Sequence, residues 1–170
     1  MLGVALDVHY EEKQATVAAV TFDAWNAPSA KAEYVSTMPY SPAEYEPGQF
    51  YKRELPYLTG LLSVIPDTPT VVVVDGYVWL GPQRRGLGMY LHDSLGGNTP
   101  VVGVAKRSFA GNNAIQITRG KSQTPLWVTA QGMAPQAAAS YIGYMAGPYR
   151  IPTLLKRVDQ LCRGLVTPLP

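Results

Sequence analysis

Two aspartates stand where this sequence could build a catalytic or metal-binding site. Asp7 and Asp75 each end or interrupt a short apolar run, residues 2–8 and 70–75, of the kind that forms a strand covered on both faces. A carboxylate in such a position is costly unless another group compensates it. The two side chains either reach solvent at the ends of their strands or form a pair of metal ligands at the carboxyl ends of neighbouring strands, where the sites of α/β sheets gather.

Two further charged residues could join such a site. Glu54 lies near the start of a segment with helical apolar spacing, and in the first turn of a helix it would be stabilised by the helix dipole without any catalytic role. Lys106 follows the apolar run 101–105, either as an ordinary surface lysine or as a cation beside a phosphate or a developing negative charge. The sequence pattern leaves both interpretations of each residue open.

Several other chemistries are excluded by the residues present. The only cysteine is Cys162, which rules out a disulfide framework and a zinc site of four cysteines. His9 and His92 are the only histidines, so histidine-based catalysis has few candidates. Residues 120–122 resemble the end of a P-loop, but Ile115 stands where its first glycine is required, and ATP or GTP binding by that route is rejected.

The size and composition indicate one folded domain over residues 1–170. Apolar residues make up 46% of the chain, which excludes a disordered protein. A net charge of +2 does not by itself indicate a nucleic-acid partner, although a local basic patch can lie on a nearly neutral protein. With no apolar stretch of about 18 residues and no basic segment before the first apolar run, we expect a soluble, cytoplasmic monomer that does not bind membranes.

The elements that would position these residues follow from the apolar spacing. Strands are expected first, then a proline-rich loop, a helix that Pro66 ends, and an alternation of strand and helix. The expected segments are strands at 2–8, 15–22 and 31–38, a loop at 39–48, a helix from residue 50, a strand at 70–75, a loop at 76–86, a helix at 87–95, a strand at 100–105, a hairpin of 114–118 with 126–130, and helices at 135–145 and 152–165. This order predicts a mixed α/β sheet with helices on both faces.

The motifs occur in an order that resembles the endonuclease V family over nearly the whole chain. Glu54 and Asp75 are 21 residues apart, the spacing associated with that family. The proline-glycine pair followed by an arginine-glutamate pair is the most specific block. The matching blocks are Asp7-Val8-His9-Tyr10, Tyr45-x-Pro47-Gly48-x-Phe50-x-x-Arg53-Glu54-x-Pro56, Val74-Asp75-Gly76, Val102-Gly103-Val104-Ala105-Lys106 and Tyr149-Arg150-Ile151-Pro152.

The resemblance implies a ribonuclease-H-like fold, with a mixed five-stranded sheet and helices on both faces. It also implies an endonuclease that uses Mg²⁺ or Mn²⁺ to cleave DNA near a deaminated base, chiefly deoxyinosine, or in some members inosine-containing RNA. Asp7, Glu54 and Asp75 would form the acidic metal site, and Lys106 would lie near the scissile phosphate. The residues expected to contact nucleic acid are Tyr45 and Pro47 in a wedge that separates the strands, Gly48 next to them, and Gly76 and Val78 at the base pocket.

Physical chemistry agrees with an acidic metal site. Carboxylate oxygens suit Mg²⁺, which keeps several waters and takes few protein ligands. Two like charges about 5 Å apart repel by roughly 3 kcal/mol at an effective dielectric near 20. A cluster of three carboxylates is therefore unfavourable until a cation neutralises it.

Two departures from the family pattern keep other hypotheses open. Met133 stands where the family usually has a histidine, and Val78 stands where it has a second glycine lining the base pocket. The stretch between Lys106 and Met133 is also shorter than usual. The alternatives are an endonuclease with a changed base preference, a nucleic-acid-binding protein that kept the fold without the chemistry, and a ribonuclease-H-like nuclease with another phosphodiester substrate.

Overall fold

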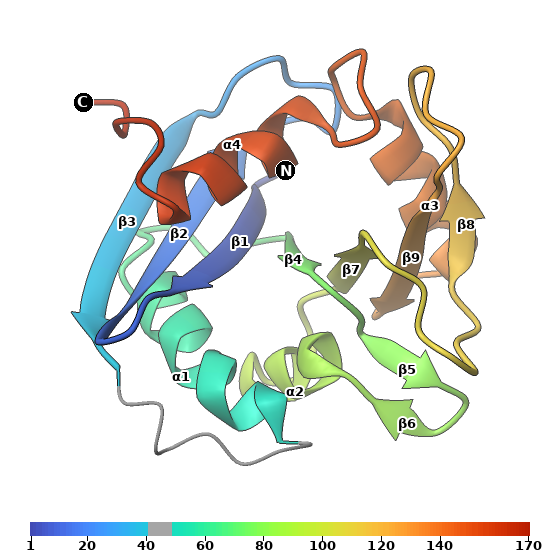
Figure 1. Ribbon diagram of the computed structural model, residues 1–170, viewed down its shortest axis with the longest axis horizontal. Helices are drawn as coiled ribbons and strands as arrows, with labels where there is room; N and C mark the ends of the chain where they lie inside the picture. The colour runs from blue at the N-terminus through green and yellow to red at the C-terminus, as the bar shows by residue number, and fades with distance from the viewer. Residues whose placement is uncertain (41–48) are drawn as a thin grey trace.

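A computed structural model describes residues 1–40 and 49–170 and contains a seven-stranded mixed sheet between two layers of helices (Figure 1). The strand order is β3-β2-β1-β4-β7-β9-β8. These strands are β1 (Gly3–Tyr10), β2 (Gln14–Phe22), β3 (Ala32–Pro39), β4 (Val71–Asp75), β7 (Val101–Ala105), β8 (Ile115–Ile117) and β9 (Leu126–Gln131). Strands β1, β4 and β7 run parallel at the centre, and the other pairs are antiparallel.

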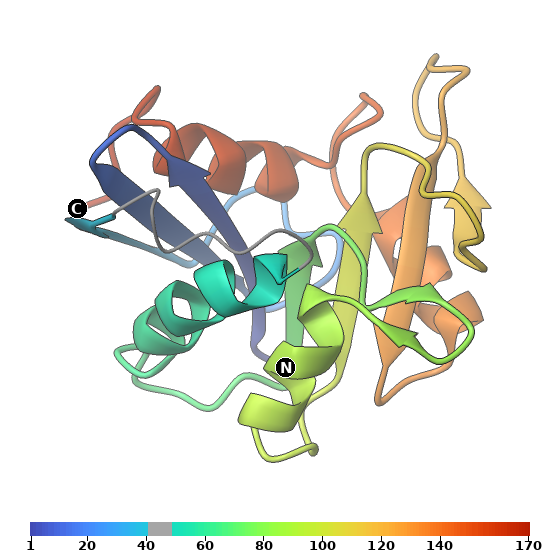
Figure 2. The ribbon, with the colours of Figure 1, turned by 60° about the horizontal axis from the view of Figure 1, so that its bottom comes forward.

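The central strands are buried because helices cover both of their faces. The helices are α1 (Phe50–Leu62), α2 (Leu87–Ser94), α3 (Pro135–Tyr144) and α4 (Thr153–Cys162). One core packs α1 and α2 on the sheet through residues such as Leu58 and Leu91, and the other packs α3 and α4 through Ile142 and Val158. Figure 2 shows the two helix pairs on opposite sides of the strands. The prediction of a mixed α/β sheet with helices on both faces is confirmed.

Some details differ from the sequence predictions. The sheet has seven strands instead of five, because the hairpin of β8 and β9 pairs with the free edge of β7. The expected loop at 76–86 holds a small hairpin of β5 (Trp79–Gly81) and β6 (Arg84–Arg85), which forms its own two-stranded sheet. Helix α1 ends before Pro66, at Leu62. Most of the expected loop at 39–48 lies outside the described residues.

Two glycines allow the chain to leave β4 directly after Asp75. Gly76 has a φ of +100°, a conformation that other residues rarely adopt. Gly103 lies beneath this turn, and a Cβ at that position would lie 2.6 Å from the carbonyl oxygen of Gly76. The close approach of these two backbones sets the path of the segment that leads into the β5–β6 hairpin. In the described part of the chain, no helix is long and apolar enough to cross a membrane.

Candidate active site

The register of the parallel strands brings Asp7 and Asp75 side by side. Leu6 of β1 is paired with Val74 of β4, so the next residues of the two strands are the two aspartates. Asp75 is in turn paired with Val104 of β7, and Lys106 lies two residues beyond that partner. The carboxyl ends of parallel strands meet at one edge of a sheet, which is why three distant segments contribute to one place.

Glu54 reaches the same place from α1. It is not in the first turn of the helix, which contains no acidic residue, so the interpretation of Glu54 as a dipole-stabilising residue is wrong. Asp7, Glu54 and Asp75 line one cavity of about 10 Å³, close to the smallest space that holds a water molecule. The structure therefore gathers the three acids, while their roles stay a prediction.

The arrangement disfavours negative charge on two of these acids. Burial, followed by the charge of Asp75, raises the pKa of Asp7 to about 7, although Lys106 and the N–H of Val8 oppose the shift. That N–H donates to the Asp7 Oδ1 atom at 2.8 Å. Burial and then the charge of Asp7 raise the pKa of Glu54 to about 8. A bound cation would favour the ionised forms of both groups.

Lys106 is the counter-charge that pairs with Asp75. Its Nζ atom lies 3.1 Å from the Oδ2 atom of Asp75, and both side chains are partly exposed. Burial lowers the pKa of Lys106, but the charges of Asp75 and Asp7 outweigh it, and the net shift is upward. Lys106 therefore stays protonated at neutral pH, and it lines a neighbouring pocket together with Asp7 and Asp75.

The donor set fits a divalent cation that keeps much of its water. Carboxylate oxygens are the ligands that Mg²⁺ and Mn²⁺ prefer, and Mg²⁺ needs only one or two of them beside waters and substrate phosphates. Across residues 1–40 and 49–170, no three His, Cys, Asp or Glu side chains lie close enough to enclose one ion. The three acids face a common cavity, so the fit is to an open site of few protein ligands and not to a closed cage.

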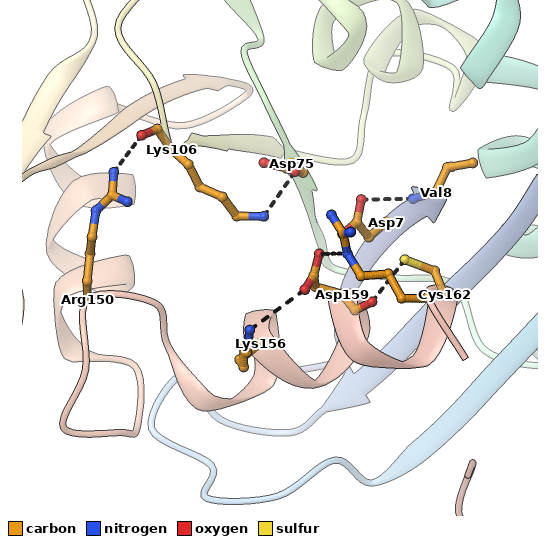
Figure 3. Close-up of polar contacts among 9 residues, drawn as sticks. Asp7, Val8, Asp75, Lys106, Arg150, Lys156, Asp159 and Cys162 are labelled. Carbon is orange, nitrogen blue, oxygen red and sulfur yellow. Dashed lines mark hydrogen bonds and ion pairs between the residues drawn. The ribbon is translucent and has the colours of Figure 1, made fainter. Parts of the chain in front are cut away.

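A fourth acid, Asp159 of α4, belongs to this region and was missed in the sequence. Its charge contributes to the raised pKa values of Asp7 and Lys106, and only 13% of its side chain is exposed. Figure 3 shows Asp7, Asp75 and Asp159 arriving from β1, β4 and α4 around one space. The Tyr149–Pro152 block could have pointed to Asp159. It precedes a predicted helix, and Asp159 lies two turns into that helix on the same face as Leu155, which lines a pocket with Asp7 and Asp75.

Met133, which stands where the family usually has a histidine, lies away from the three acids, and its effect on activity stays a prediction. Strand β9 runs antiparallel to β7, with Trp127 opposite Ala105 and Gln131 opposite Val101. Met133 follows Gln131, so it lies beyond the amino end of β7, at least about 13 Å from the acidic edge at 3.3 Å per residue. Its side chain packs against the core beneath α3 and α4.

Val78 was expected to narrow a base pocket, but its side chain lies in the core instead. Its side chain is fully buried and touches the backbone region of Gly88, where an added Cβ would lie 2.6 Å from the valine Cγ2. The valine N–H donates to the Thr129 hydroxyl at 2.8 Å. Gly76, in contrast, does line a hollow of about 200 Å³ next to Asp75. Tyr45, Pro47 and Gly48 lie outside the described residues.

The mixed sheet, with two aspartates at the carboxyl ends of its central strands, defines the class of this protein as the proteins with a ribonuclease-H-like fold. A family model described as Endonuclease V matches residues 2–156, and the chain belongs to the endonuclease V family. The chain is 30% identical over 185 residues to Endonuclease V of Streptomyces coelicolor, covering 94% of this chain and 76% of that protein.

Solved structures of endonuclease V have the same fold. The enzyme of Streptomyces avermitilis superposes with a TM-score of 0.76 at 25% identity, covering 97% of this chain and 81% of that one. The catalytic domain of human endonuclease V gives a TM-score of 0.78 at 20% identity, over 96% of this chain and 81% of that one. The Ciona intestinalis enzyme, solved with a 23mer DNA containing an inosine followed by a ribo-adenosine, gives 0.73 at 20% identity, over 96% and 84%.

Proposed function

We propose that this protein is a metal-dependent endonuclease that cleaves a phosphodiester bond in DNA near a deaminated base such as inosine, with RNA as an alternative substrate. The observation that carries the proposal is the gathering of Asp7, Glu54 and Asp75 around one cavity, with Lys106 paired to Asp75. Membership of the endonuclease V family supports it, as does the inosine-containing DNA bound to the Ciona intestinalis enzyme.

In the proposed reaction, Asp7, Glu54 and Asp75 would hold Mg²⁺ or Mn²⁺. The bound ion would activate a water for attack and would stabilise negative charge on the leaving oxygen. Lys106 keeps its proton and presents its Nζ atom to a phosphate oxygen, where it offsets the charge that develops during hydrolysis. Asp159 lies on the side of α4 and makes a small contribution to the negative field at Asp7.

The hollow next to Asp75 is the proposed site of an extruded base. It holds about 200 Å³ and is lined by aromatic and apolar side chains, by the Gly76 backbone and by Arg85. Phe50 and Tyr77 offer flat apolar surfaces, which offset part of the unstacking cost of a base that leaves the duplex. Tyr45, Pro47 and Gly48, which precede α1 in the sequence, are proposed to contact the strands beside this base.

Cations that flank the hollow are proposed to contact the phosphates. The guanidinium carbon of Arg84 lies 5.1 Å from the centre of the Phe109 ring, and that of Arg85 lies 5.0 Å from the Tyr90 ring. Arg85 is also paired with Asp93, whereas none of the ion pairs among the described residues contains Arg84. Arg84 is therefore the better candidate for a phosphate contact.

The proposal is tested by nicking of an inosine-containing duplex in Mg²⁺ or Mn²⁺. We expect cleavage near the inosine that Asp75→Asn abolishes, since the change removes a metal-binding charge at nearly constant shape. Asp23→Asn is the matched control, because Asp23 is an exposed aspartate paired with Lys31 and should leave cleavage unchanged. Cleavage without preference for inosine would point to a different phosphodiester substrate. The absence of cleavage of any DNA or RNA would contradict the proposal.

The second candidate function is a nucleic-acid-binding protein without catalysis, motivated by Met133 and Val78. Against it, neither residue lines the cavity of the three acids, and both side chains pack against the core. Salt-sensitive binding to nucleic acid without cleavage, unchanged by Asp75→Asn, would support this second function.

A further inference from the structure

Lys106 is tied to the rest of the molecule through its backbone, and we propose that Arg150 is a positioning residue that holds Lys106 for the cleavage reaction. This inference rests on the proposed function, in which the ammonium group of Lys106 faces the scissile phosphate. Arg150 does not contact the acids. It acts on the peptide group of Lys106, from the side opposite to the Nζ atom that meets Asp75, as Figure 3 shows.

One guanidinium group joins three segments that are distant in sequence. The Nη2 atom of Arg150 donates to the carbonyl oxygens of Lys106 at 2.5 Å and of Pro125 at 2.8 Å. Lys106 directly follows β7, Pro125 directly precedes β9, and Arg150 lies in the segment between α3 and α4. Because β7 pairs with β9, the arginine holds the two places at the acidic edge where the chain leaves β7 and where it enters β9.

A second arginine holds the segment that presents Arg150. Arg119 is 7% exposed, and burial lowers the pKa of its guanidinium. Its donors meet only backbone carbonyls of residues 143–150 in the described structure, and no carboxylate faces it. The Nη1 atom donates to Tyr149 at 2.7 Å and to Arg150 at 3.4 Å, and the Nη2 atom donates to Met145 and, at 3.2 Å, to Gly147.

The physical reason for such a support lies in the lysine side chain. A lysine side chain is a flexible stem of four carbons with about 2 kcal/mol of rotamer entropy. Such a stem does not fix the Nζ atom by itself, so the position of that atom depends on where the lysine backbone is held. Lys106 lies one residue past the last hydrogen-bonded pair of β7, which ends at Ala105. Without Arg150, its peptide group has no other side-chain donor in the described residues. A displacement of about 1 Å at a reacting group can slow catalysis by roughly 100-fold.

The experiment is a double-mutant cycle on single-turnover nicking. We expect Arg150→Ala to lower the rate by roughly 10- to 100-fold while KM for the oligonucleotide stays nearly constant. In the Lys106→Ala background, we expect Arg150→Ala to have no further effect, because the group that it positions is gone. Rate losses that multiply in the double variant would overturn the inference. No loss in Lys106→Ala alone would overturn it too, together with the proposed role of Lys106.

Arg157→Ala separates positioning from general loss of stability. Arg157 binds Glu33 at 2.7 Å and 2.9 Å and donates to the Thr167 carbonyl oxygen at 2.8 Å, far along the chain from Lys106. Its removal should lower the melting temperature without changing the nicking rate below that temperature. A rate loss in Arg157→Ala as large as that in Arg150→Ala would contradict a specific role for Arg150.

Hydrogen exchange supplies a readout that needs no activity. We expect faster amide exchange over residues 105–108 in Arg150→Ala than in wild type, and no change there in Arg157→Ala. Should Arg150→Ala fail to fold, Arg150→Lys keeps the charge but loses the guanidinium fork, and the same exchange and rate changes are expected. Unchanged exchange over residues 105–108 in a folded Arg150 variant would sink the inference even if the metal-dependent nicking of the wild type is established.

Discussion

At the scale of single residues, the protonation of Asp7 and Glu54 links the site to the stability of the fold. Both carboxyls have raised pKa values, about 7 and about 8, because they are buried beside other negative charge. The folded protein therefore binds these two protons more tightly than the unfolded chain, whose carboxyl pKa values lie near 4. Protons and a metal ion therefore compete for the same carboxylate oxygens.

The metal-free protein should lose stability as the pH rises from about 4 to about 8. In this window the folded state holds more protons than the unfolded state, so the free energy of unfolding falls with rising pH, by several kcal/mol in total. Urea unfolding in EDTA at several pH values measures this. Mg²⁺ should reduce the loss, and the double variant Asp7→Asn with Glu54→Gln should flatten the profile. A stability that rises over this range would contradict the raised pKa values.

Asp159 invites a test of whether its charge or its ion pairs matter. We expect Asp159→Asn to slow metal-dependent cleavage by at least about tenfold, because it removes negative charge from the field at the proposed metal site. Arg163 pairs with Asp159 at 2.9 Å, so Arg163→Ala breaks that ion pair while leaving the carboxylate in place. Single-turnover rates should fall in the first variant and not in the second. Equal rates in the two variants would assign Asp159 a structural role only.

At the scale of elements, the exit from β4 sets where the hollow lies relative to Asp75. The turn at Gly76 passes directly over Gly103 of β7, and the carbonyl of Gly76, the N–H of Val78 and the hydroxyl of Thr129 surround the place of a missing side chain. The β5–β6 hairpin and its arginines follow from this turn. The close contact between the backbone of the turn after β4 and the backbone of β7 therefore controls the shape of the proposed base site.

Gly103→Ala should lower the free energy of unfolding by roughly 2 kcal/mol, because the new methyl group would lie 2.6 Å from the carbonyl oxygen of Gly76 and 2.8 Å from the nitrogen of Val78. Gly60→Ala is the matched control. Its Cβ meets nothing within 4 Å, and alanine in the helix interior should stabilise by about 0.5–1 kcal/mol. Chemical denaturation of both variants measures the difference. Similar stabilities would show that the β4 exit tolerates displacement.

At the scale of the whole molecule, the helices cover both faces of the sheet and leave the strand ends for chemistry. Charge at this edge is of both signs: the acids line the cavity, while Lys106, Arg84 and Arg85 lie around it. A net charge of +2 is small, so attraction to a polyanion must come from such a local arrangement. The β5–β6 hairpin extends from the body beside this edge in both views (Figures 1 and 2).

Binding to DNA should therefore depend on salt through a few cations. We expect Arg84→Ala to weaken binding of an inosine-containing duplex in EDTA and to reduce the slope of log K against log salt by about 1, the effect of one lost phosphate contact. Lys31→Ala is the control, since Lys31 pairs with Asp23 at 3.2 Å before β3. Fluorescence anisotropy over a salt series measures both slopes. An unchanged slope in Arg84→Ala would remove Arg84 from the proposed nucleic-acid surface.

The sequence by itself determined the local elements of this protein and the residue types of its site. Apolar runs such as Val71–Val74 and the helical spacing after Phe50 depend only on neighbours along the chain, so strands and helices could be predicted close to their observed bounds. The motif order likewise predicted Asp7, Glu54, Asp75 and Lys106 as a set.

Only the tertiary structure decided which further residues lie beside Asp7, Glu54, Asp75 and Lys106. The antiparallel register of β9 puts Met133 at the wrong end of the sheet, the packing of the segment after Asp75 turns Val78 into the core, and α4 brings Asp159 to the acids. Arg119 and Arg150 bind backbone carbonyls, which every residue has, so their partners could not be predicted from the sequence even though Arg150 lies in one of the motif blocks. The face, register and hydrogen-bond partner of a side chain depend on segments far away in the chain, and only folding brings those segments together.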